Sequence, residues 1–168
     1  MSIFDNVNFQ TPDWVCKIMA DLIPNEPYPE TILEPTPGAG NLAKAIDARF
    51  SSAIIYTPQH FEKFDKHCVD CIVANPPFTP MQVGYDLLDK FFELSDNIII
   101  LMPWLALINS EKRTAKYIEH GLKHVIHLPR KAFNGSRVQT CILVFKKGYT
   151  GDIIFKSLKK DILGNYRL

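Results

Sequence analysis

The sequence predicts an α/β fold with a mostly parallel sheet. Short apolar runs rich in β-branched residues alternate along the chain with stretches whose apolar residues have helical spacing. Two of the runs end in loops suited to ligand binding, at 34–40 and 75–78, and open α/β sheets bind ligands at the carboxyl ends of their strands. With 168 residues, 46% hydrophobic and 22% charged, the chain has the size and composition of one globular domain spanning 1–168.

The first half of the chain contains three expected helices and three expected strands. Thr11 can cap the first helix, with Pro12 at its first helical position. A glycine turn then separates a short strand from the second helix, and a β-branched run ends the half. In order, we expect a helix at 13–23, a strand at 31–34, a helix at 41–50, a strand near 53–56, a short helix near 59–65 and a strand at 70–74.

The second half is expected to continue the alternation and to end in a hairpin. We expect a helix at 81–95, a strand at 97–102, a polar helix at 109–119 and strands at 125–128 and 140–145. The last two strands, joined by 129–139, would add an antiparallel edge to the sheet. The C-terminal extension at 148–168 is expected to hold a short strand at 153–155 and a loose tail.

The segment Asn75-Pro76-Pro77-Phe78 is the most informative feature of the sequence. Two prolines fix two φ angles and remove two backbone N–H groups, so the chain leaves the preceding strand stiffly. The Asn75 Oδ1 and the Pro76 carbonyl can each accept one N–H from a flat ring that carries an exocyclic amine, and Phe78 can stack on that ring. The alternative is an ordinary turn, because Asn-Pro and Pro-Pro are common in loops.

Two further motifs lie upstream. In Glu34-Pro35-Thr36-Pro37-Gly38-Ala39-Gly40-Asn41-Leu42 an acid ends a strand and glycines allow close backbone approach to a ligand. An ordinary strand-to-helix turn is the alternative there. Thr11-Pro12-Asp13-Trp14-Val15 precedes the first helix.

In this order the three motifs resemble those of S-adenosylmethionine-dependent DNA adenine methyltransferases, over roughly residues 9–147. The resemblance implies a Rossmann-like methyltransferase fold in compact form, without a target-recognition domain. It implies catalytic roles for Asn75, Pro76, Pro77 and Phe78. It also implies that an N-terminal cofactor helix, within 1–24, and the glycine loop bind S-adenosylmethionine through Thr11, Pro12, Glu34, Pro35, Thr36, Gly38, Gly40, Asn41 and Leu42.

The middle of the chain departs from that family. Only 34 residues separate Gly40 from Asn75, which leaves room for one βα unit where the family has two. The family's acid for the ribose hydroxyls is absent at the end of the strand near 53–56, with Glu62 and Asp65 as candidate substitutes. The middle units are therefore expected to be shortened.

The charge distribution suggests a polyanionic partner. Residues 1–84 have a net charge of −5 and residues 85–168 a net charge of +6. We expect DNA, with adenine as the target, to contact Arg130, Lys131 and Arg137, while Lys146, Lys147, Lys159 and Lys160 are interpreted as ordinary solvated lysines. A protein partner or self-association would supply sequence specificity.

The remaining features favour a cytoplasmic protein without a metal. No apolar run is long enough to span a bilayer, and the start of the chain has no basic signal-peptide region. Cys68 and Cys71 have metal-like spacing, but no second pair matches it, so buried free thiols are expected. The function expected is methyl transfer to adenine in DNA. The alternatives are methylation of an RNA base or a protein glutamine, or a degenerate fold that only binds a partner.

Overall fold

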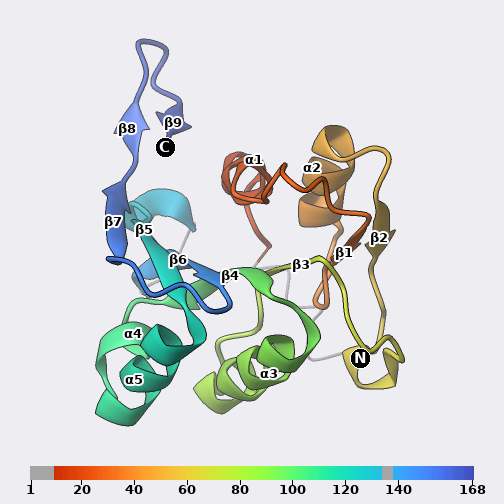
Figure 1. The fold of residues 1–168 in the computed structure, drawn as a ribbon. Helices are drawn as coiled ribbons and strands as arrows, with labels where there is room; N and C mark the ends of the chain where they lie inside the picture. The colour runs from red at the N-terminus through yellow and green to blue at the C-terminus, as the bar shows by residue number, and fades with distance from the viewer. Residues whose placement is uncertain (1–9, 134–137) are drawn as a thin grey trace.

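The computed structural model describes residues 10–133 and 138–168, which form a seven-stranded sheet with helices on both faces (Figure 1). The strand order is β2-β1-β3-β4-β6-β5-β7, and only β6 runs antiparallel to its two neighbours. The strands are β1 (Thr31–Leu33), β2 (Ile54–Tyr56), β3 (Cys71–Ala74), β4 (Asn97–Pro103), β5 (Leu122–His127), β6 (Thr140–Lys146) and β7 (Ile154–Ser157). A separate two-stranded hairpin pairs β8 (Lys159–Lys160) with β9 (Tyr166–Arg167).

Two helical layers cover the sheet. One layer holds α1 (Asp13–Asp21) and α2 (Asn41–Arg49). The other holds α3 (Met81–Leu94), α4 (Leu105–Ile108) and α5 (Glu111–His120) (Figure 1). Two short 3-10 turns, η2 (Phe61–Lys63) and η3 (Arg130–Ala132), complete the described elements.

The core follows from the two-residue period of the central strands. On β4, Ile98 and Ile100 belong to the apolar cluster under α3, whereas Ile99 and Leu101 belong to the cluster under α1. Because both faces of β4 are buried, its sequence is one continuous run of apolar residues after Asn97. Each fully buried isoleucine contributes about 1.5–3 kcal/mol relative to an exposed one.

The end of α5 depends on a glycine. Gly121 has a φ of 113° and forms the C-cap of the helix. A Cβ atom at this position would lie 2.1 Å from the Lys146 carbonyl oxygen. Only glycine combines this backbone conformation with such close contact to β6.

The structure confirms the Rossmann-like methyltransferase fold and the shortened middle. A single short strand, β2, follows α2, and it forms the edge of the sheet beside β1. The expected antiparallel pair is present as β5 and β6.

Two details differ from expectation. The antiparallel pair is not at the sheet edge, because β7 adds parallel to β5 outside it. The segment after 157, expected to be a loose tail, contains the β8–β9 hairpin, which projects from the body of the molecule (Figure 1). The short helix α4 was also not predicted, because four residues are too few to show helical periodicity.

The four cysteines are free, and three of them are buried. Burial raises the pKa of the Cys16 thiol to about 12 and raises the pKa of the Cys71 thiol as well. Cys68 is exposed, so the expectation of a buried thiol was wrong for that residue. Within residues 10–133 and 138–168, no group of three or more His, Cys, Asp or Glu side chains could hold a metal ion. In the same part of the chain, no helix is both long enough and apolar enough to cross a membrane.

Candidate active site

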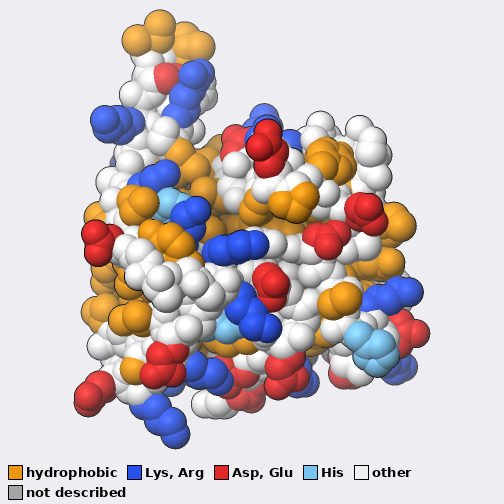
Figure 2. All heavy atoms as spheres, in the orientation of Figure 1, with side chains coloured by type: hydrophobic (Ala, Val, Ile, Leu, Met, Phe, Trp, Pro, Cys, Tyr) orange, Lys and Arg blue, Asp and Glu red, His pale blue; other side chains and the backbone are white. Residues whose placement is uncertain are grey.

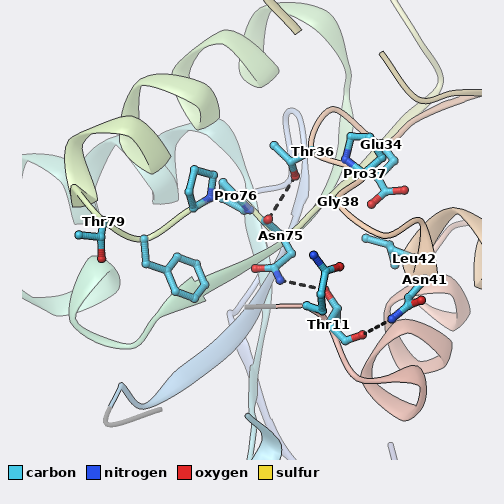
Figure 3. Close-up of a pocket in the computed structure, with 13 residues that line it drawn as sticks. Thr11, Glu34, Thr36, Pro37, Gly38, Asn41, Leu42, Asn75, Pro76 and Thr79 are labelled. Atoms are coloured by element: carbon cyan, nitrogen blue, oxygen red, sulfur yellow. Dashed lines mark hydrogen bonds between the residues drawn. The ribbon is translucent and has the colours of Figure 1, made fainter. Parts of the chain in front are cut away.

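A pocket lies beyond the carboxyl ends of β1 and β3, beside the start of α2 (Figure 3). It brings together the three motifs, which are far apart in the sequence. Its lining consists of Gln10, Thr11, Glu34, Thr36, Pro37, Gly38, Asn41, Leu42, Asn75, Pro76, Pro77, Phe78 and Thr79.

Asn75 is held from two sides. Its side-chain Nδ2 donates to the Thr11 Oγ1 over 2.8 Å, and its backbone carbonyl accepts from the Thr36 Oγ1 over 3.1 Å (Figure 3). Because Nδ2 is directed at Thr11, the amide oxygen of Asn75 lies on the opposite side of the group. The N-terminal element and the glycine loop thus both fix the residue that ends β3.

Thr11 has a different role from the one its position predicts. The N-cap of α1 is Pro12, which makes no side-chain capping bond, so the expectation that Thr11 caps the helix was wrong. Its hydroxyl instead accepts from Asn75, and its carbonyl accepts from the Asn41 Nδ2 over 3.4 Å. Thr11 is 6% exposed, so loss of its hydroxyl would remove a hydrogen bond from the partly buried Asn75 amide.

The glycine loop is shaped by Gly38 and Gly40, which have φ values of 50° and 79°. A Cβ on Gly38 would lie 2.8 Å from the Gln10 Nε2, whereas a Cβ on Gly40 would meet no atom within 4 Å. Gln10 also accepts from the Ala39 backbone N–H through its Oε1, over 2.9 Å. This side chain therefore holds the loop beside the pocket.

Glu34 is the one carboxylate among the described residues that line the pocket. It is 2% exposed, and its Oε2 has no hydrogen-bond partner within the described part of the chain. Burial raises the pKa of this carboxyl from 4.5 to about 7, and the Ala43 backbone amide in the first turn of α2 partly offsets the shift. The pocket thus contains a buried acceptor suited to a cationic donor.

The end of β2 offers no comparable group. Thr57 follows the strand and is exposed. Glu62 pairs with His60, with 3.4 Å between the carboxylate Oε1 and the ring Nδ1, and Asp65 is exposed. Neither candidate substitute for the missing acid lines the pocket.

Most of the residues expected from the sequence line one pocket, and a few lie beside it. Pro12, Pro35 and Gly40 neighbour lining residues in the chain without lining the pocket themselves. Arg130 and Lys131 are exposed on η3, away from the lining, and Arg137 lies outside the described residues. The sequence did not predict Gln10, Pro37 or Thr79 as site residues, although Pro37 lies within a recognised motif and Gln10 and Thr79 adjoin one.

Comparisons with known proteins support the fold. No protein-family model and no curated protein sequence matches the chain. Among solved structures, it is similar to a protein of Vibrio vulnificus YJ016 described as a type I restriction enzyme modification subunit, with a TM-score of 0.70 and 15% identity over 96% of this chain and 49% of that one. The type I restriction-modification methyltransferase subunit of Streptococcus thermophilus gives a TM-score of 0.70 and 17% identity over 94% and 50%.

A third similar structure comes from Listeria monocytogenes. It is described as a class I S-adenosylmethionine-dependent methyltransferase, with a TM-score of 0.73 and 14% identity over 94% of this chain and 67% of that one. At these identities the likeness shows a shared fold. The chain spans about half the length of the two restriction-modification subunits.

Proposed function

We propose that this chain transfers a methyl group from S-adenosylmethionine to the exocyclic amine of adenine in DNA. The observation that carries the proposal is the position of Asn75-Pro76-Pro77-Phe78. This segment begins at the carboxyl end of β3, and Asn75 is hydrogen-bonded to Thr11 and linked through its carbonyl to the glycine loop. An ordinary turn would not need these two connections.

The pocket fits the methionine end of S-adenosylmethionine. That end carries an ammonium group, and the unpartnered Glu34 Oε2 is a buried acceptor for it. Gly38 lines the pocket with a positive φ and has no side chain, so a ligand can approach the loop backbone there. The residues that would hold the cofactor are Glu34, Thr36, Gly38, Asn41 and Leu42, with Thr11 beside them.

The chain's own residues would prepare the target amine. S-adenosylmethionine, when bound, supplies a methyl group on a sulfonium sulfur. An exocyclic amine is a poor nucleophile because its lone pair is delocalised into the ring. The Asn75 Oδ1 and the Pro76 carbonyl would accept hydrogen bonds from its two N–H groups and so localise that lone pair on the nitrogen. Phe78 would hold the ring. Positioning and fixed dipoles then supply the rate enhancement.

DNA is the proposed substrate for two reasons. The similar structures include two subunits of type I restriction-modification systems. The second half of the chain carries most of the positive charge, as a phosphate-binding surface would. A target base in a duplex must leave the stack, at a cost of a few kcal/mol. A protein partner would supply sequence specificity.

The test compares native protein with Asn75→Ala on duplex DNA, RNA and protein, using mass spectrometry of the methylated products. We expect methyladenine in DNA, lost by about 10²-fold or more in the variant, as when one preorganised polar group of an active site is removed. Cofactor affinity, measured by calorimetry, should stay nearly unchanged. Asn75→Asp is the matched control, because it keeps an acceptor oxygen.

Three results would contradict the proposal. Full turnover of Asn75→Ala would show that the segment is only a turn. Methylation found only in RNA or only in protein would move the substrate to that class. A native chain that binds no cofactor at millimolar concentration would be a binding module with a methyltransferase fold.

A further inference from the structure

The β8–β9 hairpin has a turn that is built from its own side chains. The Asp161 Oδ1 accepts from the backbone N–H groups of Leu163 and Asn165, each over 2.9 Å. Gly164 takes a φ of 81° within the same turn. The Arg167 guanidinium pairs with the Asp161 Oδ2 over 2.7 Å. The turn therefore has a defined shape.

This turn presents two large apolar side chains to solvent. Ile162 is 102% exposed and Leu163 is 78% exposed. In Figure 2 the hairpin extends from the body with hydrophobic atoms at its tip and cationic side chains below them. Apolar side chains this exposed gain little from burial within the chain, and adjacent exposed apolar side chains on a projecting turn are typical of an interaction site.

The strands behind the tip are basic. Lys159 and Lys160 of β8 are exposed, and Lys159 lies directly opposite Arg167 of β9. Like charges directly opposite on paired strands are destabilising, and Asp161 offsets only one of them. A bound polyanion would relieve this repulsion. The interpretation of Lys159 and Lys160 as ordinary solvated lysines does not account for their placement on a projecting hairpin.

The base of the hairpin is attached to α1, on the face of the sheet that α1 and α2 cover. The Tyr166 and Trp14 rings have centroids 4.8 Å apart, which joins β9 to α1. Tyr166 packs on the same apolar cluster as Phe78 of the pocket. That cluster also contains Ala132 of η3, the turn that carries Arg130 and Lys131. The hairpin, the basic turn and the pocket thus share one side of the sheet.

We propose that the β8–β9 hairpin enters the major groove of the DNA substrate, with Lys159 and Lys160 on phosphates and Ile162 and Leu163 against thymine methyl groups. This proposal rests on the proposed function and names how the substrate is held. The major groove admits a two-stranded β-ribbon, and it is where thymine presents its methyl group. Since adenine pairs with thymine, contact with that methyl favours the base pair that contains the target.

The charge of the hairpin favours DNA over a second copy of the chain. Two copies that met through their tips would bring two sets of cationic strands together. DNA instead supplies negative charge for the strands and an apolar contact for the tip. Neutralisation of DNA phosphates by the lysines depends on the salt concentration, whereas contact with thymine methyl groups does not. The contributions of the strands and of the tip to DNA affinity can therefore be measured separately.

The experiment measures duplex binding by fluorescence anisotropy at several salt concentrations. The plot of log affinity against log salt concentration has a negative slope, and Lys159→Ala/Lys160→Ala should make it less steep by about 2 units, because two phosphate contacts are lost. Ile162→Ser/Leu163→Ser should keep the native slope and weaken binding about tenfold by losing apolar contact. The matched control for the lysine variant is Lys90→Ala/Lys112→Ala, which removes two exposed lysines on α3 and α5. The matched control for the tip variant is Leu105→Ser/Ile108→Ser, which changes two exposed apolar residues on α4.

A second probe tests the groove contact itself. A duplex in which every thymine is replaced by deoxyuridine lacks only the methyl groups. The native protein should bind it severalfold more weakly than the thymine duplex, and Ile162→Ser/Leu163→Ser should bind both equally. Circular dichroism and cofactor calorimetry on each variant would show that the fold and the pocket are intact.

Contrary outcomes separate this proposal from the function it rests on. If the hairpin variants bind DNA as native protein does, while native protein still methylates DNA, the hairpin proposal alone would be overturned. Equal native affinity for the thymine and deoxyuridine duplexes would overturn the methyl contact. Absence of any DNA binding by native protein would overturn both. A tip variant that changes only the oligomeric state, measured by sedimentation, would assign the tip to a second copy.

Discussion

The two ends of the proposed cofactor site are built very differently. On the side of β1 and β3, Thr11, Thr36 and Asn75 are joined by hydrogen bonds, and Glu34 is buried beneath them. On the side of β2, the strand is three residues long, lies at the sheet edge and is followed by the exposed Thr57. In the proposed site the methionine end of the cofactor would thus be preorganised, and the nucleoside end would find no comparable polar group.

This difference separates the chemistry from the affinity. The groups that would touch the reacting atoms all lie on the preorganised side. The nucleoside of S-adenosylmethionine contributes to binding but not to the reaction. A chain that has shortened its middle would therefore keep its catalytic geometry and bind the cofactor less tightly. Substitutions on the two sides should affect different measured quantities.

The largest effect on this comparison is expected from Glu34→Gln. The folded state holds a proton on Glu34 between its unfolded pKa of 4.5 and its folded pKa of about 7. The unfolded state binds fewer protons in that range, so the native free energy of unfolding falls as pH rises through it. The loss is about 3 kcal/mol at most, and the variant should not show it.

The measurement is urea unfolding of both proteins between pH 4.5 and 8, taken as a difference so that other titrating groups cancel. The free energy of unfolding of the variant should rise relative to that of the native protein up to about pH 7. Above that pH the difference between the two free energies should stay constant. A gap that does not change with pH would mean that Glu34 is ionised in the folded state. Calorimetry should also show that the native protein releases protons on binding the cofactor near pH 7, because an ammonium neighbour lowers the pKa of Glu34.

A smaller effect is expected from Thr11→Val. Valine keeps the shape of threonine and removes the Oγ1 that accepts from Asn75 over 2.8 Å. The loss of one partly buried hydrogen bond corresponds to about 1 kcal/mol, or a rate reduction of about five- to tenfold. Since Thr11 positions Asn75, kcat should fall while the KM for cofactor changes little.

Steady-state kinetics on DNA tests this positioning role, and Thr11→Ser is the control because it keeps the hydroxyl. An equal loss in both variants would show that the Thr11 methyl group matters and the hydrogen bond does not. A change confined to the KM for cofactor would assign Thr11 to cofactor binding.

The sequence predicted the interior of the molecule well because burial leaves a periodic signal. The runs that became β3, β4 and β6 are apolar on both faces, and the motifs at Glu34 and Asn75 lie at strand ends, where the fold places ligand sites. The contact between Thr11 and Asn75 was not predictable, because it joins residues 64 positions apart and replaces a local cap. The short strand expected at 153–155 is present as β7, whereas the exposed β8–β9 hairpin carries no such periodic pattern and was not predicted.

The smallest effect is expected on the other side of the comparison, from Thr57→Asp. The residue follows β2 directly, at the position where the resembling family carries an acid for the ribose hydroxyls. If the nucleoside lies over this strand end, a carboxylate there would accept from the hydroxyls and raise cofactor affinity about fivefold, the value of one hydrogen bond. Calorimetry with the demethylated cofactor product would measure the gain, and Thr57→Asn, which lacks the charge, is the control. The kcat of methyl transfer should not change, since Thr57 lies outside the residues that touch the reacting atoms. A gain in affinity without a gain in kcat would sharpen the division between the two ends, whereas unchanged affinity would mean that the nucleoside does not lie at the end of β2.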